Sequence, residues 1–236
     1  MKVKANQLHE FVKKSSFNGL IPGSVYKLTT QGLENFNKTL DTMALVHGIL
    51  KSHAVKGDVG FTFSIGSNER LLKCLKEFGD EDIELVVNEQ AGRLHILGKS
   101  LQVECVMTSP NMIDSTLEEM PATLHWEAEP FKMDSGLFKK AANYAKILGQ
   151  NSLKIKVENG ELMIVSGEEN FDQFTQKTKV SAQDFQAEYG EALHNIVEVL
   201  EGDLLCWAKN DYPLKFEEEN PTIKMTAICA PVVAKE

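Results

Sequence analysis

The sequence predicts an α+β protein made of two similar halves, each with two helices packed on extensive antiparallel sheet. The first observation is that four amphipathic helical patterns recur roughly every 60 residues, beginning near Leu8, Asn68, Ser135 and Gly190. The second is that alternating, strand-like sequence follows each of them. This rhythm indicates one supersecondary unit that is used four times, arranged as helix, strands, helix and strands in each half.

In the first half, the opening helix is predicted from apolar and small residues at i, i+3, i+4 and i+7, namely Leu8, Phe11, Val12 and Ser15. Strands are expected at 25–29, 43–46 and 58–63. Ser67 and Asn68 are typical capping residues, and they predict the start of a second helix that buries Leu71, Leu72, Leu75 and Phe78. Three more strands are expected at 83–87, 93–97 and 101–107.

A segment of different composition divides the chain near its midpoint. Pro110 and Pro121 bracket polar residues that carry isolated large apolar side chains, namely Met112, Ile113, Leu117 and Met120. A flexible linker does not need such side chains, so we expect this one to lie against a domain surface. The sequence therefore predicts an N-terminal domain at 1–107, a connector at 108–124 and a C-terminal domain at 125–236.

The second half repeats the plan of the first. After a predicted start at Asp134 and Ser135, a third helix has the apolar face Phe138, Ala141, Ala142, Ala145 and Leu148. Strands are expected at 152–157, 161–166 and 171–180, and Asn159-Gly160 is a typical hairpin turn between the first two. A fourth helix buries Leu193, Ile196, Val197 and Leu200, and closing strands are expected at 204–208, 214–217 and 223–229.

Composition and the absence of targeting signals favour an intracellular globular protein. The chain has 236 residues, 42% of them hydrophobic, and a formal net charge of −9. Its start does not resemble a signal peptide, and no apolar stretch approaches the ~18 residues that span a bilayer. We expect no membrane association, and a location in the cytoplasm of a prokaryotic or infected host cell, or in the nucleus if the source is eukaryotic.

Positive charge gathers on the helices of this acidic chain. The first helix carries Lys13 and Lys14, the second Arg70, Lys73 and Lys76, and the third Lys139, Lys140 and Lys146. Each set taken alone is typical of a solvated helix face. Repeated on equivalent helices, they predict a positive surface that contacts phosphates without sequence preference. The fourth helix differs, because it carries Glu191, Glu198 and Glu201 and no lysine or arginine.

No catalytic or metal-binding motif is present in the sequence. It lacks a phosphate-binding glycine loop with the required spacing, a His-Glu-x-x-His pair and a Gly-x-Ser-x-Gly elbow. Its six histidines show no ligand spacing, and the four cysteines form no Cys-x-x-Cys pair, so we interpret the cysteines as reduced core residues. We predict no enzyme, no catalytic residue, no metal and no cofactor. A nucleic-acid-processing enzyme that uses the acidic clusters is a weaker alternative.

Several short segments resemble the PCNA-type DNA sliding clamps. The run Phe131-Lys132-Met133-Asp134-Ser135-Gly136-Leu137-Phe138 resembles the opening of that family's second domain. Segment 211–216 resembles its penultimate strand, and 228–231 its closing alanine-proline. In the first half, 31–34 followed by 44–46 matches the family's corresponding turn and strand. The resemblance covers essentially the whole chain and suggests a shortened archaeal, viral or phage member.

The resemblance implies a ring of three subunits that encloses duplex DNA and tethers DNA polymerase and other replication and repair factors. The helices would line the hole, and the ring would do no chemistry. Partner polymerases and the clamp loader would bind through short peptide motifs. The residues that the resemblance places toward DNA are Lys13, Lys14, Arg70, Lys73, Lys76, Lys139, Lys140 and Lys146.

The resemblance also implies two protein-binding surfaces. A pocket for a partner peptide would comprise Met43, Leu117, Met120, Pro213, Ile228, Ala230 and Pro231, although Met43 and Ile228 are equally well interpreted as core residues. The subunit interface would pair edge strands and include Leu101, Val103, Cys105, Phe171, Phe174 and Thr178. Two alternatives keep the same fold: a monomeric processivity factor, and a clamp-like subunit of a hetero-oligomeric ring.

Overall fold

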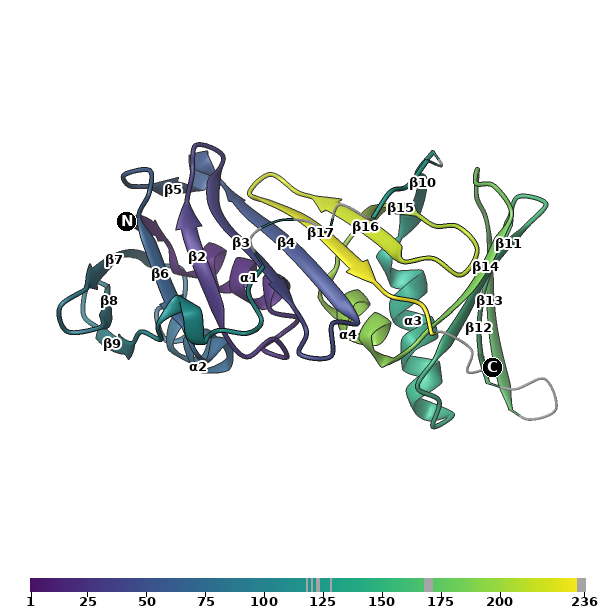
Figure 1. Cartoon of the computed structure of the whole chain (residues 1–236), viewed down its shortest axis with the longest axis horizontal. Coiled ribbons are helices and arrows are strands. Elements are labelled where there is room, and N and C mark those ends of the chain that lie inside the picture. The colour runs from purple at the N-terminus through teal and green to yellow at the C-terminus, as the bar shows by residue number, and fades with distance from the viewer. Residues whose placement is uncertain (118, 120, 122–123, 128, 168–171, 233–236) are drawn as a thin grey trace. The chain divides into compact units, whose positions relative to one another are not determined.

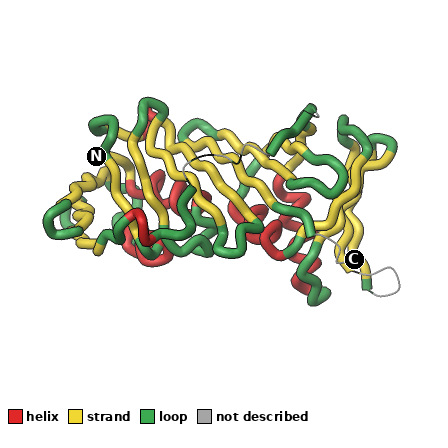
Figure 2. The backbone as a smooth tube through the Cα atoms, in the orientation of Figure 1, coloured by secondary structure: helices red, strands yellow, loops and turns green. Residues whose placement is uncertain are grey.

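The computed structural model describes residues 1–117, 119, 121, 124–127, 129–167 and 172–232. The chain forms two compact units. Unit 1 comprises Met1–Glu119 together with Glu219–Met225, and unit 2 comprises Met120–Glu218 together with Thr226–Glu236. Strands make up most of the regular structure in each unit, and four α-helices accompany them in the described part of the chain (Figure 2).

Unit 1 alternates short helices with antiparallel strands, as the first half of the sequence predicts (Figure 1). Its elements, in chain order, are β1 (Lys2–Lys4), α1 (Ala5–Ser15), β2 (Ser24–Leu28), β3 (Gly32–Lys38), β4 (Ala44–Lys51), η1 (Ser52–Ala54), β5 (Val55–Lys56), β6 (Thr62–Ile65), α2 (Asn68–Lys76), β7 (Asp82–Asn88), β8 (Arg93–Leu97), β9 (Gln102–Val106) and η2 (Pro110–Met112).

The strands of unit 1 form two sets on which the helices pack. One set has the order β5-β1-β7-β8-β9, and the other has the order β4-β3-β2-β6. Helix α1 packs against β3 and β4 and lies beside α2. The apolar face predicted for α1 is buried, since Leu8, Phe11 and Val12 have no exposed surface.

Unit 2 repeats this construction. Its elements are β10 (Phe131–Asp134), α3 (Ser135–Ile147), β11 (Leu153–Glu158), β12 (Glu161–Gly167), β13 (Gln173–Lys179), β14 (Phe185–Tyr189), α4 (Glu191–Val199), β15 (Asp203–Trp207), β16 (Leu214–Glu219) and β17 (Ile223–Cys229), the last two extending into the short segment that counts with unit 1. One set of strands has the order β13-β12-β11-β14, and the other has the order β10-β15-β16-β17. Helix α3 packs on β12 and β13 and lies beside α4.

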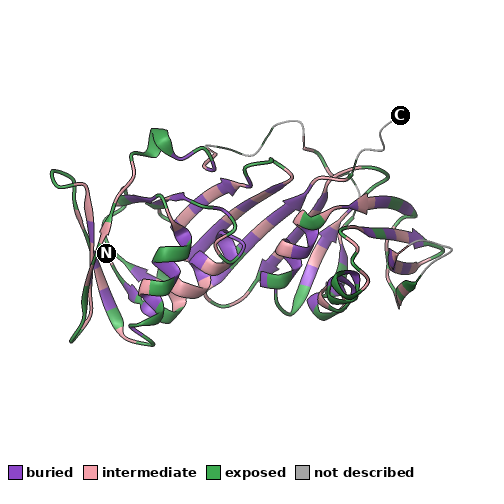
Figure 3. Cartoon of the chain, turned by 90° about the horizontal axis from the view of Figure 1, so that it is seen from below, coloured by how far each residue is buried: buried purple, intermediate pink, exposed green. Residues whose placement is uncertain are grey.

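The strand orders of the two units correspond one to one, which confirms the predicted internal repeat. The order β1-β7-β8-β9 in unit 1 has its counterpart in β10-β15-β16-β17, and β6-β2-β3-β4 has its counterpart in β14-β11-β12-β13. In each unit the two helices lie side by side, with buried residues toward the strands and exposed residues on the outer side (Figure 3). Unit 1 adds β5, which extends its first set by one strand.

All four predicted helices are confirmed, but five of the strands had not been predicted. The turn at Asn159-Gly160 is also confirmed, because both residues have positive φ, 52° and 75°, as a tight hairpin turn requires. The strands missed by the sequence analysis are β1, β3, β5, β10 and β14. Most of them are short, and pattern analysis needs a longer alternating run to detect a strand.

Strand β3 was missed for a different reason. Its sequence contains Asn35 and Asn37, which disfavour a strand, yet both are buried in unit 1. The Asn35 amide donates to Ser15 Oγ at 2.8 Å, and the Asn37 amide donates to Ser24 Oγ at 2.9 Å. Partners distant in sequence therefore accept from the amide nitrogens of both side chains, and local propensity is overruled by tertiary hydrogen bonds.

The first part of the predicted connector lies on unit 1. Ser115 Oγ donates to the Gly23 carbonyl at 2.7 Å, and the Leu117 amide donates to the Phe36 carbonyl at 2.9 Å. Ile113 is buried. This part of the connector therefore packs on a domain surface, as its apolar side chains predicted.

The chain just after the predicted connector is fixed to unit 2 by an aromatic cluster. Trp126 Nε1 donates to the Pro213 carbonyl at 2.9 Å, and the Trp126 ring packs edge-on against Tyr212 at 5.8 Å between centroids. The Lys215 ammonium lies 4.1 Å from the centroid of the Trp207 ring and 5.6 Å from that of Trp126. These contacts hold the chain that enters unit 2.

Within the described part of the chain, no helix has both the length and the apolar character required to cross a membrane.

Candidate nucleic-acid interface

The exposed side of α2 presents three cations in unit 1. The helix starts at a side-chain cap, in which Ser67 Oγ accepts from the Arg70 amide at 3.3 Å. Arg70, Lys73 and Lys76 are all exposed. The Lys73 ammonium pairs with Glu69 one turn earlier at 2.5 Å, and this contact lowers the pKa of the Glu69 carboxyl. Exposed pairs of this kind contribute little to stability, so Lys73 remains available to another anion.

Helix α1 contributes one accessible lysine rather than two. Lys13 is half-buried, whereas the Lys14 side chain is only 2% exposed and lies 3.7 Å from Glu10. The prediction that Lys14 forms part of the DNA-facing surface is therefore wrong. The physical reason is that α1 packs against both α2 and the strands, which buries a wider face than a single apolar stripe.

Lys13 of α1 and Lys76 of α2 act on one shared neighbour. Burial lowers the pKa of the half-buried His9 imidazole, and the charges of Lys13 and Lys76 lower it further, while Glu10 opposes them. Two ammonium groups can affect the same imidazole in this way only when they lie near it. The two helices of unit 1 thus contribute positive charge to one surface.

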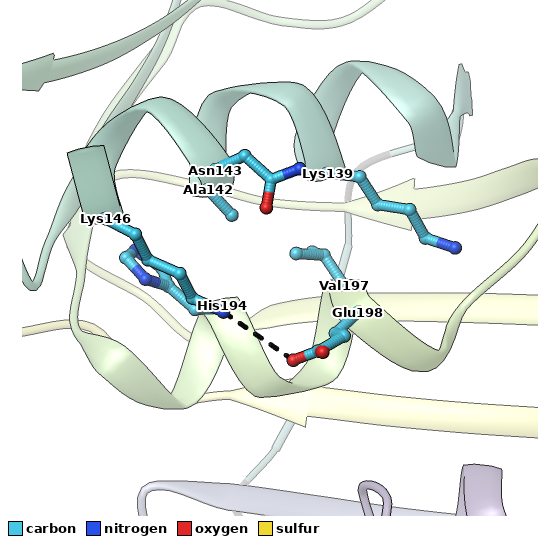
Figure 4. A pocket seen from close by; sticks show the side chains of 7 residues that line it. All are labelled: Lys139, Ala142, Asn143, Lys146, His194, Val197 and Glu198. Atoms are coloured by element: carbon cyan, nitrogen blue, oxygen red, sulfur yellow. Dashed lines mark ion pairs between the residues drawn. The ribbon is translucent and has the colours of Figure 1, made fainter.

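In unit 2, a notch of about 200 Å³ separates α3 from α4 (Figure 4). Asp134 caps the start of helix α3, because its carboxylate accepts from the Gly136 amide at 2.8 Å. Helix α3 lies beside α4. The notch is lined by Lys139, Ala142, Asn143, Lys146, His194, Val197 and Glu198. Lys140 is exposed on α3 but does not line the notch.

The notch brings opposite charges together. The Lys146 ammonium lies 3.7 Å from a carboxylate oxygen of Glu198, and both side chains are about half exposed (Figure 4). The acidic helix therefore turns one of its carboxylates toward the lysines of α3. Because the pair is solvated, it contributes little to stability, and Lys146 can leave Glu198 for another anion.

His194 forms the buried end of the notch and was not singled out from the sequence. It is 3% exposed, and its Nε2 has no hydrogen-bond partner among the described residues. Burial lowers the pKa of its imidazole, the charge of Lys146 lowers it further, and Glu191 opposes them. The sequence did contain one indication of this burial, because His194 lies next to Leu193 and Val197 on the predicted apolar face of the helix.

Strands β9 and β13 are free edges of their sheets in the described structure. Of the residues predicted for the subunit interface, Leu101 is exposed, and Val103, Cys105, Phe174 and Thr178 are half-buried. Phe171 lies outside the described residues. The Phe174 ring stacks on Tyr144 of α3 at 4.2 Å, so one face of β13 already packs on its own unit.

The hydrogen-bond register shows which backbone groups face outward from these edges. In β9, the Met107 amide donates to Gly92, so Cys105 and Val103 bond inward to β8. In β13, the Val180 amide donates to Gly160, so Thr178 and Phe174 bond inward to β12. The outward-facing backbone groups belong to residues that the sequence analysis had not named: Gln102, Glu104, Val106, Gln173, Thr175, Lys177 and Lys179.

The residues predicted for a partner-peptide pocket fall in both units. Met43 and Leu117 are half-buried in unit 1, and Pro213, Ala230 and Pro231 are half-buried in unit 2. Ile228 is only 3% exposed in β17, which favours its alternative interpretation as a core residue. Met120 lies outside the described residues. This pocket stays a prediction.

Two units of the same topology, each with a pair of helices on antiparallel strands, define the sliding-clamp fold. No protein-family model matches the sequence, and no curated protein is significantly similar to it. Solved structures, however, match it over almost its whole length.

Those structures are PCNA clamps at low sequence identity. The structure of A. fulgidus PCNA with the C-terminal region of FEN-1 bound matches with a TM-score of 0.82 and 16% identity, covering 100% of this chain and 98% of that one. PCNA from Entamoeba histolytica matches with a TM-score of 0.83 and 15% identity, covering 98% of each chain. The PCNA2-PCNA3 complex from Sulfolobus tokodaii matches with 0.78 and 14%, covering 98% and 99%. The chain therefore has the fold of the PCNA sliding clamps, as the resemblance predicted.

Proposed function

We propose that this chain is a DNA sliding clamp: three copies close into a ring around duplex DNA and tether a polymerase to it. The observation that carries the proposal is the likeness in fold to PCNA clamps over the whole chain. The exposed cations of α2 and α3 support it, because they offer phosphate contacts on the helices of both units. The protein has no catalytic role in this proposal and requires no cofactor.

The proposed mechanism is a topological tether. A polymerase attached to a ring that cannot leave the DNA rebinds at a high effective concentration instead of from bulk solution. The ring itself must move along the duplex, so its contacts need to be electrostatic and independent of sequence. Lysines on solvated helix faces provide such contacts, since their long side chains follow the phosphates without reading the bases.

Ring closure is proposed to occur between β9 of one subunit and β13 of the next. Both strands are edges, and each presents outward-facing backbone groups that a partner strand can satisfy. A contact between two different surfaces is head-to-tail, so it produces a closed ring or an open filament. The likeness to clamps favours the closed ring.

Encirclement is tested by comparing circular and linear DNA. We expect protein incubated with a nicked circular plasmid to stay bound at a salt concentration that dissociates purely electrostatic complexes. The same protein should be released when the plasmid is cut once. The physical reason is that a ring can slide off a free end but cannot leave a circle. Gel filtration of the complexes before and after cutting measures the amount of protein that stays bound to the plasmid. Equal retention on both forms of the plasmid would contradict encirclement.

We further propose that partner proteins bind through a short helical peptide with apolar anchors. The A. fulgidus clamp was solved with the C-terminal region of FEN-1 bound. In this chain, Met43 and Leu117 offer half-buried apolar side chains on unit 1. Replacing both with Ser should weaken binding of a FEN-1 C-terminal peptide at least about tenfold, because each lost apolar contact is worth roughly 1 kcal/mol or more.

Fluorescence anisotropy of the labelled peptide measures this change in affinity. Met112→Ser is the matched control, because Met112 is 75% exposed on unit 1 and is not part of the proposed pocket. Unchanged affinity in the double variant would place the pocket elsewhere.

A second candidate function is a subunit of a hetero-oligomeric clamp. The PCNA2-PCNA3 complex of Sulfolobus tokodaii favours it, since that structure contains two different clamp chains. The two candidates differ in whether β9 accepts β13 of an identical chain or of a different one. The oligomeric state of the purified chain separates them.

A further inference from the structure

The notch between α3 and α4 contains a polar group that the protein itself leaves unsatisfied. His194 is almost completely buried, yet its Nε2 has no hydrogen-bond partner within the part of the chain that the structure describes. A buried imidazole nitrogen without a partner is costly, and such groups in folded proteins often indicate a function. Its neighbours on the same helix face, Leu193 and Val197, are buried apolar residues.

Charged groups from both helices surround this imidazole. Lys139 and Lys146 of α3 and Glu198 of α4 line the notch together with His194 (Figure 4), and the charge of Glu191 of α4 also acts on the imidazole. Glu198 already pairs with Lys146 at 3.7 Å. The notch therefore holds two lysines, one of which is engaged by an exchangeable carboxylate contact.

The chemistry of the lining selects an anion with several acceptor oxygens. Two lysines, Asn143 and His194 line a space of about 200 Å³. A water molecule occupies about 30 Å³ of liquid, so the notch has room for a tetrahedral group of a few heavy atoms. A phosphodiester group is such an anion, and lysines and amides are common donors to it.

We propose that this notch binds a backbone phosphate of DNA, and that His194 takes up a proton from solvent when the phosphate enters. The Nε2–H of the resulting imidazolium donates to a phosphate oxygen, and Lys146 turns from Glu198 toward the same group. Lys139 contributes positive charge from the other end of the notch. The proposal rests on the proposed function, because it takes DNA as the partner of the helix surface.

The sign of the pH dependence follows from the two states of His194. In the free protein, burial and Lys146 lower the pKa of His194, so the imidazole is neutral at pH 7. The negative charge of a bound phosphate favours the imidazolium, so the pKa is higher in the complex. DNA affinity should therefore rise as the pH falls below the pKa of the complex, and stop rising below the pKa of the free protein.

The test compares the pH dependence of DNA binding in three proteins. Binding of a short labelled duplex is followed by fluorescence anisotropy from pH 8 to pH 6 at constant salt, for the wild type, His194→Gln and His53→Gln. His53 is exposed in η1 and serves as the matched control. We expect the wild type and His53→Gln to bind roughly threefold to tenfold more tightly at pH 6, since a pKa shift of one unit upon binding corresponds to about tenfold. His194→Gln should lose most of this increase.

The same pH dependence in His194→Gln as in the wild type would overturn the proposal. A second measurement does not depend on the folding of the variant: the NMR titration of the His194 ring in ¹³C-histidine-labelled wild type, with and without duplex. An upward shift of the pKa upon adding DNA is expected, and an unchanged pKa overturns the proposal. Absence of duplex binding at every pH would overturn the proposed function as well, whereas binding with an unaltered His194 pKa would overturn this inference alone.

Discussion

Changing Lys139 and Lys146 together to Glu is expected to reduce clamp-stimulated DNA synthesis at least about tenfold while leaving the oligomer intact. Both lysines line the notch between α3 and α4 on the solvated side of the helices. Each lost phosphate contact weakens DNA binding roughly fivefold to tenfold near 0.1 M salt, because fewer counterions are released from the DNA. The Glu side chains add repulsion beside Glu198, so the effect on DNA should exceed that of neutral substitutions.

The matched control is the same charge change on the other face of unit 2. Lys132 and Lys154 are exposed, and they alternate with buried residues of β10 and β11, which directs them away from the helices. Lys132→Glu with Lys154→Glu should therefore leave synthesis almost unchanged at equal net charge. Primer extension with and without the clamp measures the effect, and light scattering checks the oligomer. Equal loss of synthesis in both pairs would remove the notch from the DNA-facing surface.

Changing Thr175 to Pro is expected to convert the proposed trimer to monomers without unfolding the subunit. The register of β13 directs the Thr175 amide away from β12, toward the open edge. Proline at this position deletes an outward donor while the inward hydrogen bonds of Phe174 and Gln176 remain. It also places a ring where a neighbouring strand would pair, which disfavours strand addition at that edge.

Thr175→Val is the matched control for this substitution, because valine keeps the amide donor and has a high preference for strands. Light scattering of both variants at equal concentration measures the oligomer, and circular dichroism checks that both remain folded. A trimer in the proline variant would show that β13 does not form the subunit contact.

The helical part of the fold could be predicted from sequence because it depends on local patterns. Each helix has an apolar face of three or four residues, and α2 and α3 also have capping residues at their starts. Strand β3 could not be predicted, because Asn35 and Asn37 become favourable only when Ser15 and Ser24 approach them in the folded unit. Such contacts, distant in sequence, leave no periodic signal.

The candidate site was predictable in its charge but not in its detail. Exposed lysines and arginine on α2 and α3 follow from helical spacing alone. The burial of Lys14 depends on how α1 packs against α2, and the position of His194 depends on how α4 packs against α3. The outward backbone groups of β9 and β13 depend on strand register, which a strand assignment does not specify.

The proposed ring of identical subunits is tested by the absolute mass of the purified chain in solution. Light scattering across a dilution series measures this mass without a DNA partner or a loader. A mass three times that of the 26.3 kDa chain, persisting on dilution, is the expected result. A mass of 26.3 kDa at every concentration would contradict the homotrimer and favour a monomeric processivity factor or a subunit of a hetero-oligomeric clamp.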